Sequence, residues 1–208
     1  MKIKAVIARY NEPIEWVKDL GFDYIIYNKG EKISPDLISP EKVIEVANEG
    51  REAETYLRYI TENYEAIPDL VVFLQGNPFD HFPRLFEVLK ENESTKEIIP
   101  LGNNTFCDLN GNDSYPGLPM GHFRSLIIPG HSSDERIDFI AGAQFIIPGV
   151  YIKNKPLEWW NYIKDIYERY WFSAIPSGYG IPPGQFIGHV FERLWSDIFK
   201  YKLPNDGE

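Results

Sequence analysis

The stretch Asp69-Leu70-Val71-Val72-Phe73-Leu74 has the strongest strand character in this 208-residue chain. Its apolar run shows no alternation with polar residues, which is typical of a strand buried on both faces of a parallel sheet. The run ends abruptly in the polar segment Gln75-Gly76-Asn77-Pro78-Phe79-Asp80-His81. We therefore predict a central strand over residues 69–74 whose carboxyl end carries a polar loop.

Two further strands are predicted near the N-terminus. Residues 3–8 form a short apolar run closed by Arg9-Tyr10-Asn11-Glu12, and residues 22–27 form a second run closed by Asn28-Lys29-Gly30. A short helix over residues 14–20, opened by Pro13, joins the two. Strand, helix and strand in this order predict the start of a βαβ unit with parallel strands.

The rest of the chain extends this pattern. Helices are predicted over residues 40–47, 50–64, 82–91, 156–170 and 185–200, and strands over 123–128 and 139–147. Residues 102–136, rich in Gly, Asn, Pro and Ser, are expected to form an excursion from the sheet. We predict one α/β domain over residues 1–208, with a mostly parallel, Rossmann-like central sheet flanked by helices.

Composition narrows the class of protein. The net charge of −10 argues against a nucleic-acid or anionic-membrane surface. Cys107 is the single cysteine, so an intrachain disulfide and a cysteine-based zinc site are excluded. The chain has no apolar run long enough for a membrane span, and no signal-peptide core is visible. We expect a cytoplasmic protein.

Polar residues follow three of the predicted parallel strands. They are Arg9, Tyr10, Asn11 and Glu12, then Asn28 and Lys29, and then the segment from Gln75 to His81. Ligands of open parallel sheets gather beyond the carboxyl ends of the strands, so these groups are candidates for one site. Turns with capping residues are the alternative for each group taken alone.

Charged pairs elsewhere offer further candidates. Asp80 and His81 have the donor atoms that divalent metals prefer, although Asp80 also suits a helix cap. Arg51 lies with Glu52 in the first turn of a predicted helix, where it could reach a phosphate or form a simple surface pair. His189, Glu192, Arg193 and Ser196 share one face of the last helix, which is either a functional stripe or a solvated face.

Several enzyme signatures are absent from the sequence. It has no Walker loop, no Gly-x-Gly-x-x-Gly after a strand and no Gly-x-Ser-x-Gly elbow. P-loop NTPases, dinucleotide oxidoreductases and α/β-hydrolases are therefore disfavoured. No sequence feature places a base beside Cys107.

A set of blocks, in order along the chain, resembles an uncharacterised family related to GT-A type glycosyltransferases. These blocks are residues 8–12 with Trp16, residues 27–30, 48–57, 73–81, 141–145 and 192–195. The resemblance implies a GT-A-like fold with a nucleotide-binding half over residues 1–101 and an acceptor-binding half over residues 102–208. It implies transfer of a sugar from a UDP- or GDP-sugar donor to a glycan or other small acceptor.

The resemblance also implies residue roles. Tyr10, Asn11 and Glu12 would contact the base and ribose, with Arg9, Asn28, Lys29, Arg51 and Gln75 completing the nucleotide-sugar site. Asp80 would stand at the final position of the Asp-x-Asp metal motif, with His81 as a further ligand of Mn²⁺ or Mg²⁺. His189 would be a late metal or phosphate contact. Pro78 stands where the motif has its first Asp.

A catalytic base for an inverting reaction is expected among the carboxylates, with Glu192 and Asp138 as candidates and Asp108 as a third. Two alternatives stay open. One is a non-catalytic nucleotide- or sugar-binding module, and the other is a metal-dependent hydrolase using Asp80, His81 and His189.

Overall fold

The computed structural model of the chain describes residues 1–112, 114–130, 136–173 and 185–203. Within them the largest sheet has six strands in the order β3-β2-β1-β4-β10-β5. These strands are β1 (Ile3–Arg9), β2 (Asp23–Asn28), β3 (Val43–Glu45), β4 (Leu70–Gln75), β5 (Ile99–Pro100) and β10 (Phe145–Pro148). β1 is parallel to β2 and β4, and β2 is parallel to β3, whereas β10 is antiparallel to β4 and β5. The predicted α/β class with a mostly parallel sheet is confirmed.

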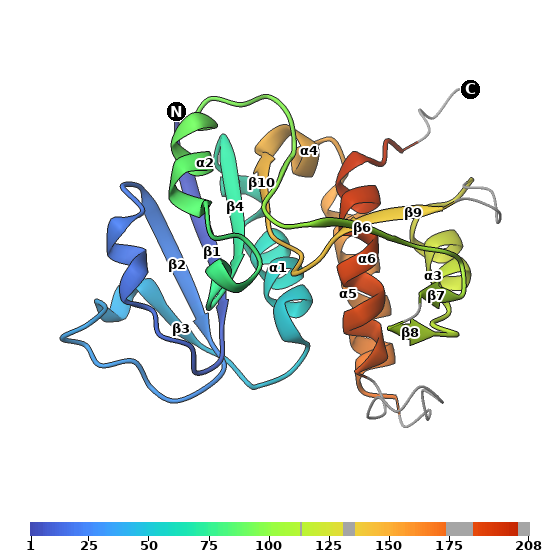
Figure 1. Cartoon of the computed structure of the whole chain (residues 1–208), viewed down its shortest axis with the longest axis horizontal. Helices are drawn as coiled ribbons and strands as arrows, with labels where there is room; N and C mark the ends of the chain where they lie inside the picture. The colour runs from blue at the N-terminus through green and yellow to red at the C-terminus, as the bar shows by residue number, and fades with distance from the viewer. Residues whose placement is uncertain (113, 131–135, 174–184, 204–208) are drawn as a thin grey trace.

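Most of the remaining elements lie to one side of this sheet (Figure 1). The helices are α1 (Arg51–Glu62), α2 (Leu85–Glu91), α3 (Met120–Ile127), α4 (Gly149–Lys153), α5 (Leu157–Trp171) and α6 (Phe186–Lys200). Short 3₁₀ helices are η1 (Glu15–Asp19), η2 (Pro40–Lys42), η3 (Tyr64–Ala66) and η4 (Pro78–Asp80). β6 (Asn104–Cys107) pairs with β9 (Ile137–Ile140), and β7 (Gly111–Asn112) with β8 (Tyr115–Pro116). α5 and α6 lie beside the sheet, with α3, β7 and β8 beyond them at the right of Figure 1.

Alternating side chains of the central strands fill two separate cores. Val6, Val71 and Phe73 belong to the larger core, which is shared with α1, α5 and α6. Their neighbours Ala5 and Val72 belong to the smaller core, which η1 and α2 cover. Successive residues of a strand point to opposite faces, and both faces of β4 are buried, so β4 is apolar nearly throughout. The sheet is therefore the middle layer between two helical layers.

One segment predicted as a helix is a strand. Residues 40–47 begin with Pro40 as expected, but the helical turn ends after Lys42 as η2. Val43 then pairs with Ile26, and β3 becomes the edge of the sheet beside β2. The β-branched Val43 and Ile44 suit an extended edge, so tertiary pairing outweighs the local helix signal from Ser39-Pro40.

Residues 123–128, for which the sequence predicts a strand, are helical instead. They belong to α3, where Met120, Phe123 and Ile127 are buried at spacings of three and four. That spacing is the helical period, and the β-branched Ile127 and Ile128 masked it. The strand predicted over 139–147 is also divided, since a turn with Gly142 at φ 85° and Ala143 at φ 50° separates β9 from β10.

The last helix is buried on nearly all sides. Its predicted polar stripe is not solvated, because His189, Arg193 and Ser196 are buried together with the apolar face. α6 packs against α1, α5 and β9. The described residues include no helix long and apolar enough to cross a membrane.

Lys155, between α4 and α5, is a fully buried cation. Its ammonium donates hydrogen bonds to the carbonyls of Tyr151 (2.8 Å) and Phe199 (3.0 Å) and to Oδ1 of Asn154 (3.0 Å). Burial lowers the pKa of Lys155 to about 8, because the charged form loses its hydration. The ammonium thus ties α4 to the end of α6.

We expect the stability contribution of Lys155 to rise with pH between about 8 and its ordinary pKa of 10.5. In that window the folded protein has released a proton that the unfolded chain still holds, so the free energy of unfolding increases with pH. Urea unfolding at several pH values measures the free energy of unfolding of the wild type and of Lys155→Met. As the pH rises from about 8 to 10.5, the wild type should gain stability relative to the variant. A constant difference would contradict the buried charge.

Candidate functional site

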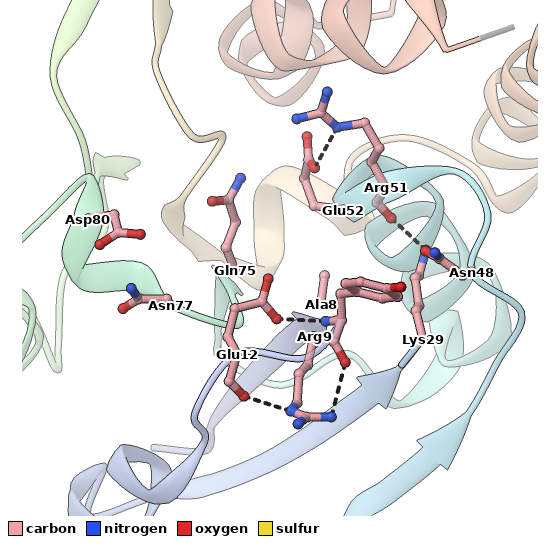
Figure 2. A pocket seen from close by; sticks show the side chains of 11 residues that line it. Ala8, Arg9, Glu12, Lys29, Asn48, Arg51, Glu52, Gln75, Asn77 and Asp80 are labelled. Carbon is pink, nitrogen blue, oxygen red and sulfur yellow. Dashed lines mark hydrogen bonds and ion pairs between the residues drawn. The ribbon is translucent and has the colours of Figure 1, made fainter. Parts of the chain in front are cut away.

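A polar pocket of about 280 Å³ opens beyond the carboxyl ends of β1 and β4. From β1 the chain proceeds outward through β2 and β3 and then returns to the other side of β1 as β4, so the strand order reverses between these two strands. Such a reversal leaves a crevice where open α/β sheets bind ligands. Figure 2 shows the lining side chains, which are Ala8, Arg9, Tyr10, Glu12, Lys29, Asn48, Arg51, Glu52, Gln75, Asn77 and Asp80.

Arg9 builds the wall of the pocket. Its Nε donates to the carbonyl of Glu12 (2.9 Å), and its Nη1 lies within bonding distance of Oδ1 of Asn28 (2.5 Å) and the carbonyl of Glu31 (3.0 Å). Asn28 is fully buried and donates in turn to Glu45 on β3 (2.8 Å). These bonds join the loops after β1 and β2, so most of the polar atoms of Arg9 and Asn28 are already hydrogen-bonded within the protein.

Asn11 and Glu12 also stabilise the loop after β1. Oδ1 of Asn11 accepts the N–H of Glu31 (2.7 Å), and Oε2 of Glu12 accepts the N–H of Tyr10 (2.7 Å). Glu12 lies against Gly76, where an added Cβ would stand 2.4 Å from that same carboxylate oxygen. Gly76 thus leaves the space that the Glu12 carboxylate occupies beside the pocket.

Lys29 anchors the start of α1. Its ammonium donates to the carbonyls of Glu49 and Arg51 and to Oε2 of Glu54 (2.9 Å). An ammonium has three donors, so all of them are used. The turn that it fixes contains two consecutive left-handed residues, Gly50 at φ 66° and Arg51 at φ 47°. A non-glycine residue in this region is strained, and such strain is common at functional sites.

This turn brings Arg51 and Glu52 to the pocket (Figure 2). The Arg51 side chain is 42% exposed, and its Nε lies 3.7 Å from Oε2 of Glu52. The Glu52 side chain is only 7% exposed, and burial raises its pKa against the opposing charge of Arg51. A largely desolvated carboxylate that faces a pocket is suited to accept a proton.

The opposite wall follows β4. Gln75, Asn77 and Asp80 line it, and within the described chain their side chains have no hydrogen-bonding partner. The fully buried Gln144 shapes this loop, since its Oε1 accepts the N–H of Gln75 (3.1 Å) and its Nε2 donates to the carbonyl of Pro78 (3.2 Å). The free amides and carboxylate leave donors and acceptors for a polar ligand.

The three predicted metal ligands lie in different surroundings. Asp80 lines the pocket, whereas His81 packs against Gly142 and His189 contacts Arg51 through Nε2 (3.1 Å). Among the described residues, no three His, Cys, Asp or Glu side chains are grouped to hold a metal ion. The described residues therefore do not bring the three expected ligands of Mn²⁺ or Mg²⁺ together, and metal binding stays a prediction.

The carboxylates predicted as catalytic lie outside the pocket. Asp138, on β9, is exposed, pairs with Arg136 (2.9 Å) and lines a separate hollow beside β5 and α6. Glu192 lies on α6, and its Oε1 accepts the N–H of Gly142 in the turn between β9 and β10 (3.0 Å). Glu52, which the sequence indicates only as a partner of Arg51, is the carboxylate that follows the strained turn into the pocket.

Part of the chain, residues 5–87, matches the model of a protein family. No curated protein and no solved structure matches the chain. All the residues that line the pocket, from Ala8 to Asp80, fall inside the matched region, whereas His189, Glu192 and Asp138 fall outside it. Residues 5–87 match the model of a family described as a protein of unknown function, DUF3431.

Proposed function

We propose that the pocket binds a nucleotide-sugar and that the protein is a glycosyltransferase with a GT-A-like fold. The observation that carries this proposal is the position of Arg51, whose partly exposed side chain lines a polar pocket at the strand reversal between β1 and β4. Guanidinium groups bind phosphate oxygens through two parallel hydrogen bonds. The sequence blocks that resemble glycosyltransferases include the same residues.

Different lining residues suit different parts of a nucleotide-sugar. We assign the diphosphate to Arg51 and the hydroxyl groups of ribose and sugar to Gln75, Asn77 and Asp80. Tyr10, which is 49% exposed at the rim, offers a ring for the base. Arg9, Asn11, Asn28 and Lys29 then act by shaping the loops, because their polar atoms are engaged within the protein.

The chemistry proposed for the site is displacement at the anomeric carbon. The oxygen of an acceptor hydroxyl bonds to that carbon, while the bond from the carbon to the diphosphate oxygen breaks and the diphosphate leaves with the electron pair. The hydroxyl proton passes to a carboxylate, a role that we assign to Glu52. Arg51 offsets the negative charge on the departing diphosphate.

Calorimetric titration with UDP, GDP and their sugar conjugates tests the proposal. Arg51→Gln should weaken binding of the preferred nucleotide by roughly tenfold or more, because a charge-assisted hydrogen bond is lost. Arg84→Gln is the matched control, since Arg84 is an exposed arginine outside the pocket that pairs with Glu87. Absence of binding by every nucleotide and nucleotide-sugar would refute the proposal.

A non-catalytic binding module is the second candidate. It is favoured by the position of Glu192 and Asp138, neither of which lines the pocket. A module of this kind would bind the nucleotide-sugar without releasing nucleoside diphosphate in the presence of acceptors or water. A metal-dependent hydrolase would instead bind Mn²⁺ with the same affinity whether or not nucleotide is present.

A further inference from the structure

His189 lies beside the guanidinium of Arg51, although 138 residues separate them in the sequence. The distance from Nη1 of Arg51 to Nε2 of His189 is 3.1 Å. A guanidinium only donates hydrogen bonds, so Nε2 has to be the acceptor and the imidazole proton resides on Nδ1. The contact therefore fixes both the tautomer of His189 and the position of one end of Arg51.

Glu192 faces the other side of the imidazole. Its Oε2 lies 3.8 Å from Nδ1 of His189, a distance that gives electrostatic attraction rather than a hydrogen bond. Burial would raise the pKa of Glu192, but the facing imidazole, the Gly142 N–H and the charges of Arg193 and Arg51 outweigh it and lower the pKa. An anionic Glu192 thus stands opposite the N–H that the Arg51 contact requires.

The plane of the imidazole is held by its neighbours. The Tyr115 ring, from β8, packs on it with centroids 4.2 Å apart, and the Arg193 guanidinium lies over Tyr115 at 4.9 Å. Gly188 leaves the space that Arg51 occupies, since a Cβ at this position would stand 2.9 Å from Cδ of Arg51. The start of α6 is therefore shaped around the arginine of the pocket.

We propose that His189 and Glu192 are positioning residues for the pocket, which hold the Arg51 guanidinium in place before a ligand arrives. Arginine has many rotamers, and a ligand that has to order a mobile side chain loses affinity. In this proposal, two residues of α6, which lie outside residues 5–87, fix the position of Arg51, which lies within them. It rests on the proposed function only for the anionic nature of the ligand.

The first measurement is independent of any ligand. In ¹⁵N-labelled protein, the heteronuclear NOE of Arg51 Nε, assigned by comparison with Arg51→Gln, reports the mobility of the side chain. We expect a rigid Nε in the wild type, a mobile one in His189→Leu and a rigid one in His189→Gln, whose amide oxygen replaces Nε2 as acceptor. Equal mobility in the wild type and His189→Leu would overturn the proposal.

The second measurement uses inorganic pyrophosphate as the probe. His189→Leu should weaken its binding by roughly three- to tenfold, the cost of ordering one long side chain, and His189→Gln should restore it. Equal losses in both variants would point to a merely structural role and overturn the proposal. If the wild type binds neither pyrophosphate nor nucleotide, the proposed function fails, while the Nε measurement still decides the positioning role.

The variant Glu192→Gln tests the contribution of Glu192 separately from that of His189. The amide keeps an oxygen that accepts the Gly142 N–H but removes the negative charge that faces Nδ1. We expect Arg51 Nε to become more mobile than in the wild type and less mobile than in His189→Leu. Unchanged mobility would remove Glu192 from the positioning pair.

Discussion

Replacing Lys29 by methionine should lower the free energy of unfolding by about 3 to 5 kcal/mol, the range measured when one partner of a buried ion pair is removed. The Lys29 and Glu54 side chains are only 4% and 10% exposed. Methionine fills similar space but leaves Oε2 of Glu54 and two backbone carbonyls, of Glu49 and Arg51, without their donor. Oε1 of Glu54 keeps the hydrogen bond from Nε of Arg58. Urea unfolding monitored by tryptophan fluorescence measures the loss.

Lys164→Met is the matched control for this variant. Lys164 pairs with Glu168 one turn away on α5 at 2.7 Å, and both side chains are partly exposed. Exposed pairs of this kind contribute about 0.5 kcal/mol or less. A loss in Lys29→Met no greater than the loss in Lys164→Met would contradict the role assigned to the buried ammonium.

Glu52→Gln should slow the release of nucleoside diphosphate from the nucleotide-sugar by roughly 10²- to 10⁴-fold, the usual contribution of a general base. The assay uses water or a sugar as acceptor, with the donor that binds best. Nucleotide affinity should change by much less, since we assign the diphosphate to Arg51. Glu49→Gln, an exposed neighbour outside this pocket, should keep the wild-type rate.

The pH dependence of this rate provides a second test of Glu52. A base acts when deprotonated, so the rate should rise with pH through the pKa of Glu52, which burial raises above its ordinary 4.5. This rising limb should disappear in Glu52→Gln. A variant with wild-type rate and an unchanged pH profile would exclude Glu52 as the base.

The sequence predicts the edge of the sheet that carries the pocket because parallel strands end at the same edge. Ala8 is paired with Gln75 on β4, and Arg9 is paired with Asn28 on β2. The polar residues that end these three strands therefore lie at the same edge of the sheet. The approach of Glu52 and Asn48 depends instead on a strained turn and on its anchor Lys29. These are tertiary features that no local periodicity encodes.

The role of α6 was harder to read for a similar reason. A helix with His189, Glu192 and Arg193 on one face has the pattern of a surface helix, and only contacts with Arg51 and Tyr115 show why these charges are buried. The helix over α3 was missed because its branched residues favour strands locally. In both cases, packing against distant segments decides the outcome.

The antiparallel strand β10 has a practical consequence for shortening the chain. β4 pairs with β10 through the register from Phe145↔Phe73 to Pro148↔Leu70, and among the described strands β5 is joined to the sheet through β10. A fragment that ends at residue 101 would expose the long apolar border of β4 with unpaired N–H and C=O groups, the kind of surface that nucleates aggregation. We therefore expect the segment that carries the pocket to aggregate when it is expressed alone, and recombinant work should keep β10 in the chain.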